Sequence, residues 1–250
     1  MNTEVLLGLG TGKLRNIKGG ISLNEFSKLI LKAKDTGIKL LDTADSYSSG
    51  DSERAIGKIR SQIKEMQICT KAGGYISNLP RPLNQFYINS KTLQKSRILL
   101  NGQYFSFDPR ITPIILRKKI EASLRRLSVN SVEIFLLHGI PEIDKFNNLV
   151  EEMIKIKSDG LARKIGMSID KTDVPDSKWC DVLQIPFGIL EHFNNHKAEL
   201  MINSFYTPDS SELLRRIKNI KSIDNNVSIL LGSRNISHIE SFSNLLKSKS

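Results

Sequence analysis

Short apolar runs alternate with amphipathic stretches along the whole chain. The apolar runs are six to eight residues long and nearly continuous in Leu, Ile and Val. Such runs are typical of parallel strands that are buried on both faces of a sheet. We therefore predict eight strands, at residues 4–10, 38–44, 66–71, 132–138, 162–168, 181–187, 198–205 and 226–233.

The stretches that follow the strands have helical periodicity. Ser22 and Glu25 form a capping-box pattern before the first helix, and Gly37 is placed to end it. Thr112 followed by Pro113 predicts the start of the third helix. We expect helices at residues 22–37, 51–63, 112–127, 146–160, 209–223 and 237–249, and short, weaker ones at 174–180 and 189–197.

An eightfold alternation of strand and helix in one chain predicts an α/β protein, and specifically a closed (β/α)8 TIM barrel. A doubly wound sheet is the alternative. The composition does not shift along the sequence, so we expect a single domain over residues 1–250. A stretch rich in Gly, Pro, Asn and Ser, residues 72–111, predicts a long loop after the third strand. Because long loops in compact domains are usually functional, we expect it to line a substrate pocket rather than only cover the barrel.

Composition and charge add limits to this picture. The chain is 39% hydrophobic, enough for a core, and its net charge of +11 is spread over helical stretches with acidic neighbours. That pattern favours solvated helix faces over a nucleic-acid surface, although an anionic cofactor also fits. Cys69 and Cys180 have no metal-binding spacing. With no secretory signal and no apolar run near the ~20 residues that span a bilayer, we expect a cytoplasmic monomer without a membrane partner.

The first strand runs into three closely spaced glycines and a lysine, in the segment VLLGLGTGKL. A Rossmann fingerprint needs a third glycine three residues after the second, whereas Gly12 follows Gly10 by two. A P-loop needs Ser or Thr after its lysine, where this chain has Leu14. We interpret the glycines as a tight exit from the strand, with Thr11 and Gly12 facing the barrel mouth.

Polar side chains stand at the ends of three consecutive predicted strands. Asp42 ends the second strand, Lys71 the third and His138 the fourth, while Tyr47 follows Asp42 in the loop. Catalytic residues of TIM barrels lie at the carboxyl ends of the strands. A lysine favours the ionised form of a nearby phenol, and a carboxylate can hold that lysine in place. The four groups could thus protonate a carbonyl oxygen while hydride arrives from elsewhere.

Each of these four residues also has an ordinary structural interpretation: a loop cap, a surface aromatic, an exposed charge and a packed histidine. Their position at consecutive strand ends favours a single site. Two other uses of the same barrel stay open. Lys71 could form a Schiff base, as in an aldolase, or the chain could be a binding subunit without catalysis.

The segments that carry these residues resemble the aldo-keto reductase family. The matches are, in order, LDTADSYSSGDSERAIG, ICTKAGG, SLRRLSVNSVEIFLLHGIP and LARKIGMS, with weaker ones at DVLQIPF and ILLGSRNISHIESFSNL. The resemblance implies that Tyr47 is the general acid, that Lys71 lowers its pKa, that Asp42 supports Lys71 and that His138 orients the carbonyl. It implies reduction of an aldehyde or ketone, or oxidation of the alcohol.

The resemblance further implies a nicotinamide dinucleotide, NADPH rather than NADH, lying across the barrel mouth. Ser168 and Gln184 would hold the carboxamide, Phe205 or Tyr206 would stack on the ring, and Arg234 would meet the 2′-phosphate. The implied cofactor residues are Thr11, Ser168, Gln184, Ser204, Phe205, Gly232, Ser233, Arg234 and His238.

Some positions depart from the family pattern. Ile169 stands where Asn is usual, and Ser241 and Phe242 replace a Glu-Asn pair. The segment between the sixth and seventh strands is short, and no sequence follows the last helix that would match the family's long C-terminal loop. We therefore expect a short member of the family, with an altered cofactor site.

Overall fold

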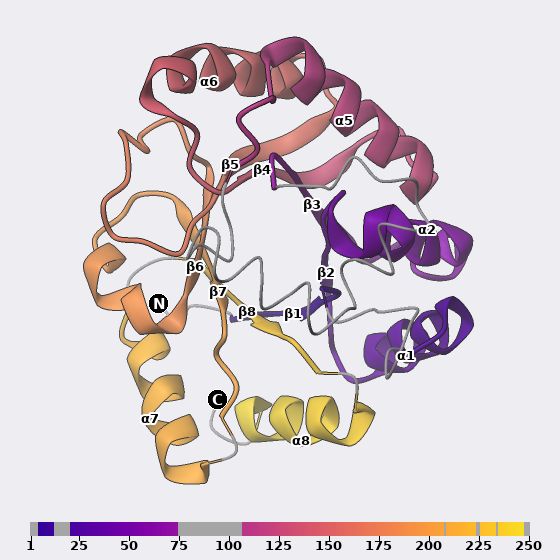
Figure 1. Cartoon of the computed structure of the whole chain (residues 1–250). Coiled ribbons are helices and arrows are strands. Elements are labelled where there is room, and N and C mark those ends of the chain that lie inside the picture. The colour runs from indigo at the N-terminus through magenta and orange to yellow at the C-terminus, as the bar shows by residue number, and fades with distance from the viewer. Residues whose placement is uncertain are drawn as a thin grey trace, which may run out of the picture.

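The eight strands form a closed parallel barrel in which sequence order is also spatial order (Figure 1). The computed structural model describes residues 5–12, 21–74, 107–207, 209–223, 226–233 and 235–247. The strands are β1 (Leu6–Gly10), β2 (Leu40–Asp42), β3 (Gln67–Ala72), β4 (Val132–His138), β5 (Ala162–Ser168), β6 (Val182–Pro186), β7 (Glu199–Asn203) and β8 (Val227–Leu231). The predicted TIM barrel is confirmed, because β1 pairs with both β2 and β8.

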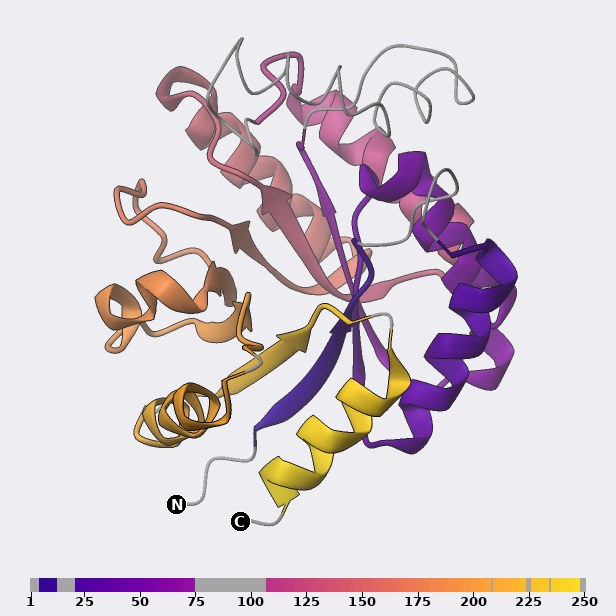
Figure 2. The ribbon, with the colours of Figure 1, turned by 60° about the horizontal axis from the view of Figure 1, so that its bottom comes forward.

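Helices surround the barrel on its outer side (Figures 1 and 2). The α-helices are α1 (Leu23–Asp35), α2 (Asp51–Lys58), α5 (Pro113–Leu127), α6 (Ile143–Ser158), α7 (Ser210–Lys221) and α8 (Ile236–Lys247). In the described part of the chain, three 3₁₀ segments accompany them: η1 (Tyr47–Gly50), η2 (Arg60–Gln62) and η3 (Phe187–Phe193).

The helix starts follow the capping chemistry of the sequence. The Ser22 hydroxyl accepts the Glu25 N–H at 3.2 Å, and the Glu25 carboxylate accepts the Ser22 N–H at 2.7 Å. The Thr112 hydroxyl accepts from the N–H of Ile115 at 3.3 Å. Each bond satisfies a backbone donor that has no partner within the helix.

Two predicted helices differ from the structure. Residues 174–180 form no helix, because Pro175 lacks an N–H and the Asp176 carboxylate turns the chain by accepting from the N–H of Lys178. The predicted helix at 189–197 is the 3₁₀ segment η3, which ends at Phe193.

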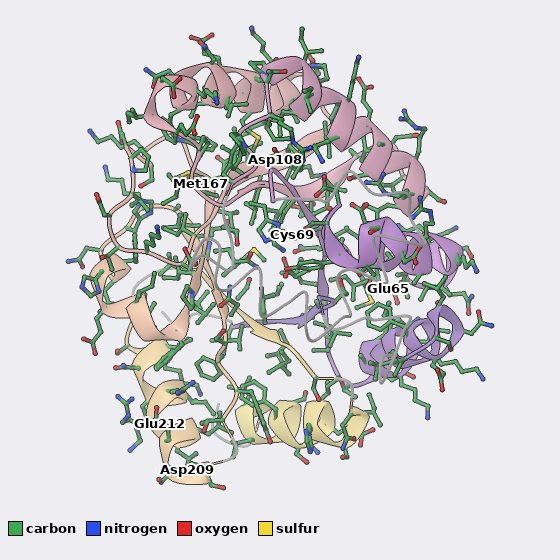
Figure 3. All side chains as sticks on the ribbon, in the orientation of Figure 1. Glu65, Cys69, Asp108, Met167, Asp209 and Glu212 are labelled. Carbon is green, nitrogen blue, oxygen red and sulfur yellow. The ribbon has the colours of Figure 1, made fainter. Side chains whose placement is uncertain are left out.

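The core has an inner and an outer part. Inside the barrel, side chains from six of the strands form one buried cluster: Leu40, Cys69, Ile134, Leu136, Val182, Met201 and Leu230. Figure 3 shows side chains filling the ring of strands around Cys69. A larger apolar cluster lies between the strands and the helices. The barrel is therefore a packed core, and its strand ends can hold polar groups at fixed positions.

Candidate active site

Asp42 and Lys71 form a buried ion pair at the ends of two neighbouring strands. The Lys71 Nζ lies 2.5 Å from Asp42 Oδ1 and 2.9 Å from the carbonyl oxygen of Thr43. Burial is the largest single effect and disfavours the ammonium, but the combined attraction of its neighbours, Asp42 first among them, raises the pKa of Lys71 above its ordinary value. Lys71 therefore stays charged at neutral pH.

Tyr47 and His138 complete the set that the sequence predicted. Lys71 Nζ lies 5.1 Å from the centroid of the Tyr47 ring. The Tyr47 and His138 rings meet edge to face, with centroids 5.8 Å apart. The structure thus brings all four predicted residues together, from β2, η1, β3 and β4.

The environment sets the protonation of both rings. Burial raises the pKa of Tyr47 above 10, and Lys71 opposes that shift without cancelling it. The sequence predicts that Lys71 lowers the pKa of Tyr47. It does not predict that burial raises this pKa by more than Lys71 lowers it. Burial, and then the Lys71 charge, lower the pKa of His138 to about 3. At neutral pH Tyr47 is therefore protonated and His138 is uncharged.

Two glycines make room for these rings. A Cβ at Gly12 would lie 3.2 Å from Cζ of Tyr47, and one at Gly74 would lie 2.8 Å from Nδ1 of His138. Gly12 was expected at the mouth, whereas Gly74 was not identified as a site residue. Its position three residues after Lys71, beyond the strand end, is the signal that could have indicated it.

Gln184 and Ser168 extend the polar network of the site. Ser168 Oγ donates to Gln184 Oε1 at 2.5 Å, and Gln184 Nε2 donates to Asp42 Oδ1 at 3.1 Å. Gln184 is only 1% exposed, whereas Ser168 is half-buried. In this structure Gln184 therefore supports Asp42 rather than facing an open position.

Besides Gln184, two further predicted cofactor residues are buried, in contrast to the sequence expectation. Thr11 is 0% exposed, and its hydroxyl donates to the Asp42 carbonyl and accepts from Ser52. Phe205 is also 0% exposed and packs edge-on against the Phe187 and Phe242 rings. Neither side chain has a surface free for a ligand, because core packing and hydrogen bonding use it.

The neighbour of Phe205 occupies the exposed position instead. Ser204 has a φ of 54°, in the left-handed region, and the chain turns there. Tyr206 is 42% exposed and stacks on His238 of α8, with ring centroids 5.8 Å apart and an interplanar angle of 15°. Tyr206 is therefore the aromatic ring with an open face at the end of β7.

The remaining predicted cofactor residues follow β7 and β8. Ser204, Gly232 and His238 are exposed, and Ser233 is half-buried. Arg234 and most of the loop at residues 72–111, from 75 to 106, lie outside the described residues. The structure describes Asn235, whose side chain accepts from the Ser237 N–H at 3.0 Å beside the start of α8.

A second layer of buried carboxylates supports the end of β3. Glu53 of α2 accepts from the Thr70 hydroxyl and from Arg126 Nε, each at 2.6 Å. The Asp45 N–H donates to the Lys71 carbonyl at 3.1 Å, while its carboxylate lies 2.6 Å from Lys119 Nζ. The sequence did not reveal these pairs, because they join residues 17 to 74 positions apart.

The described residues contain neither a candidate metal site nor a candidate membrane span. Within the described ranges, no group of three or more His, Cys, Asp or Glu residues is arranged to hold a metal ion. In that part of the chain no helix is long and apolar enough to cross a membrane.

The sequence is similar to those of bacterial oxidoreductases. It is 26% identical to the uncharacterized oxidoreductase YqkF of Bacillus subtilis and 25% identical to the NADH-specific methylglyoxal reductase of Escherichia coli, over 67% and 65% of its length. These matches cover 46% and 48% of the two relatives, so the chain spans about half the length of each.

A solved structure shows the same fold at lower sequence identity. The aldo-keto reductase of Klebsiella pneumoniae in complex with NADPH superposes with a TM-score of 0.63 at 17% identity, covering 99% of this chain and 90% of that one. The aldo/keto reductase family profile matches residues 6–192, about three quarters of the sequence. With this match and the closed barrel, the chain belongs to the aldo/keto reductase family.

Proposed function

We propose that this protein is a nicotinamide-dependent oxidoreductase that reduces an aldehyde or ketone to an alcohol, or catalyses the reverse reaction. The observation that carries the proposal is the contact of Lys71 with both the Asp42 carboxylate and the Tyr47 ring, beside an uncharged His138. Such a set can protonate an oxygen whose negative charge develops as hydride reaches the neighbouring carbon.

Each residue has a distinct part in the proposed reaction. The Tyr47 phenol gives its proton to the carbonyl oxygen as the C–H bond forms. The Lys71 ammonium stabilises the phenolate that remains, and Asp42 keeps the ammonium in position. His138, uncharged because its pKa is about 3, donates its single N–H to the same oxygen and orients the carbonyl.

The strand ends offer groups that fit a nicotinamide dinucleotide, which supplies the hydride when bound. Ser168 and Ser204 provide hydroxyls, Tyr206 an open aromatic face, and Gly232 with Ser233 an accessible backbone and hydroxyl after β8. NADPH is the cofactor we propose, with Arg234 at the 2′-phosphate. One relative was crystallised with NADPH and another is named NADH-specific, so either form is compatible with the family.

The Schiff-base alternative has less support than the reductase. A nucleophilic lysine must lose its proton, which a lowered pKa favours. Lys71 has a raised pKa, is 1% exposed and is held by Asp42 and the Thr43 carbonyl. These features suit a permanent cation rather than an amine that attacks a carbonyl.

The proposal is tested with the purified full chain, NADPH or NADH, and a panel of aldehydes and ketones that begins with methylglyoxal. We expect saturable cofactor binding, followed by loss of the reduced cofactor's absorbance when a substrate is added. Absence of binding for both cofactors would overturn the proposal. Binding without turnover across the panel would favour the non-catalytic alternative.

A further inference from the structure

The helices α2 and α5 are neighbours on the outer side of the barrel (Figure 1), and basic side chains of both line a groove between them. It contains a hollow of about 600 Å³, and a second hollow of about 260 Å³ shares Ala122 and Arg126 with it. Two small residues, Gly57 and Ala122, lie among the cations that line the groove. Six cations line this α2–α5 groove: Arg54, Lys58, Lys118, Lys119, Arg125 and Arg126.

The carboxylates near the groove balance only part of this charge, and they are buried. Asp45, Asp51 and Glu53 pair with Lys119, Arg54 and Arg126 in that order, and all three are at most 4% exposed. Among the described residues, no carboxylate pairs with Lys58, Lys118 or Arg125, and these three side chains are exposed. The surface that the groove presents is therefore positive.

Close packing of the two helices brings two of the guanidinium groups together. A Cβ at Gly57 would lie 2.2 Å from the Arg126 carbonyl oxygen, so α2 and α5 nearly touch there. A Cβ at Gly50 would lie 2.9 Å from Arg126 Nε and 3.1 Å from Arg54 Nη1, so these two nitrogens are at most about 6 Å apart. Burial and this like-charge neighbour both lower the pKa of Arg54.

We propose that the α2–α5 groove is a binding site for a small phosphorylated anion. Guanidinium groups donate in a fork that matches phosphate oxygens, and an anion here would relieve the repulsion between Arg54 and Arg126. The cations line an open hollow on the surface, whose volume is within the range of small-molecule sites. The groove is separate from the residues that we assign to catalysis and to the nicotinamide cofactor.

The choice of variants follows from what each cation contacts. Arg126 and Lys119 also hold Glu53 and Asp45, which support the end of β3, so changing them could disturb Lys71. Lys58 and Arg125 have no such pair in the described part of the chain. The test variant is therefore Lys58→Gln with Arg125→Gln. The matched control is Lys32→Gln with Arg163→Gln, which removes one lysine and one arginine from exposed positions elsewhere.

The probe is inorganic pyrophosphate, titrated by calorimetry into the full-length protein and both double variants at one fixed salt concentration, with excess NADPH present so that the proposed cofactor site is not available to the probe. We expect one saturable site in the wild type, affinity at least about tenfold weaker in the groove variant, and no change in the control. Equal weakening in both variants would reveal a general charge effect and overturn the proposal. So would unchanged binding in the groove variant, or no saturable binding to the wild type.

A second variant keeps the test decisive if the double variant melts at a lower temperature than the wild type. Ala122→Glu adds a carboxylate to the lining shared by both hollows and should abolish pyrophosphate binding. Retained binding would place the pyrophosphate elsewhere and overturn the proposal. Because the readout is direct binding, its outcome is independent of whether the protein reduces carbonyls.

Discussion

At the residue scale, His138 links the protonation of the site to the stability of the fold. Its pKa is about 3 in the folded protein and near 6.5 in an unfolded chain. Between these values the unfolded state binds more protons, so this contribution to the free energy of unfolding is complete above pH 6.5 and is lost as the pH falls toward 3.

We therefore predict that His138→Gln flattens the acid side of the stability curve. The wild-type slope should exceed that of the variant by up to about 1.4 kcal/mol per pH unit in this window. Urea unfolding at several pH values from 4 to ~7 measures both slopes. Parallel curves for the two proteins would show that His138 is not held uncharged by the fold.

Gly12 gives a residue-scale test of how tightly the Tyr47 ring is positioned. A methyl group at this position would lie 3.2 to 3.5 Å from three ring atoms, so the ring must shift slightly. We predict that Gly12→Ala lowers turnover by about tenfold with little change in melting temperature, because small displacements of reacting groups are costly. The control is Gly10→Ala, whose added carbon would make ordinary contacts at 3.7 Å. Equal activity in both variants would contradict a constrained ring.

The sequence was informative about this site where residue type and strand position agree. Asp42, Lys71 and His138 follow apolar runs, so their shared location could be inferred before any distance was known. Which of the two rings, Phe205 or Tyr206, is exposed could not be inferred in this way. The answer depends on the turn at Ser204 and on the packing of Phe205 against α8. The burial of the Thr11 hydroxyl against Ser52 is a long-range contact of the same kind.

At the element scale, the contact of β5 with β6 depends on the absence of one side chain. A Cβ at Gly166 would lie 1.8 Å from the carbonyl oxygen of Val182, a backbone atom that cannot rotate away. We predict that Gly166→Ala lowers the free energy of unfolding by about 2–3 kcal/mol. Gly188→Ala is the control, since no atom lies within 4 Å of its added carbon. Chemical denaturation compares the variants, and a similar loss in both would refute the packing argument.

Elements with strong periodicity could be predicted from sequence, and those defined by local turns could not. Seven of the eight strands lie within the predicted apolar runs and β3 extends one residue beyond its run, to Ala72, because burial on both faces leaves a clear pattern. Residues 174–180 carry enough apolar and charged residues to suggest a helix, but Pro175 and the Asp176 turn decide otherwise. The pairing of Glu53 with Arg126, across 73 positions, has no local pattern at all.

At the scale of the whole molecule, a cofactor that bridges strand ends should stabilise the closed barrel. A ligand at 100 times its Kd adds about 2.7 kcal/mol to the free energy of unfolding, or roughly 5–10 °C in Tm for a chain of this size. We predict that NADPH raises the melting temperature of the wild type.

Arg234→Ala should reduce the rise in melting temperature caused by NADPH more than the rise caused by NADH. Equal reduction of the two would show that Arg234 does not bind the 2′-phosphate.

The most direct measurement of the central claim is single-turnover oxidation of NADPH by an aldehyde substrate, in the wild type and in Tyr47→Phe. The variant keeps the ring that contacts Lys71 and His138 and loses only the proton that we assign to the carbonyl oxygen. We predict a rate at least about 100-fold lower, with NADPH affinity unchanged by fluorescence titration. A variant that retains the wild-type rate, or that loses NADPH binding, would contradict the role of Tyr47 as the general acid.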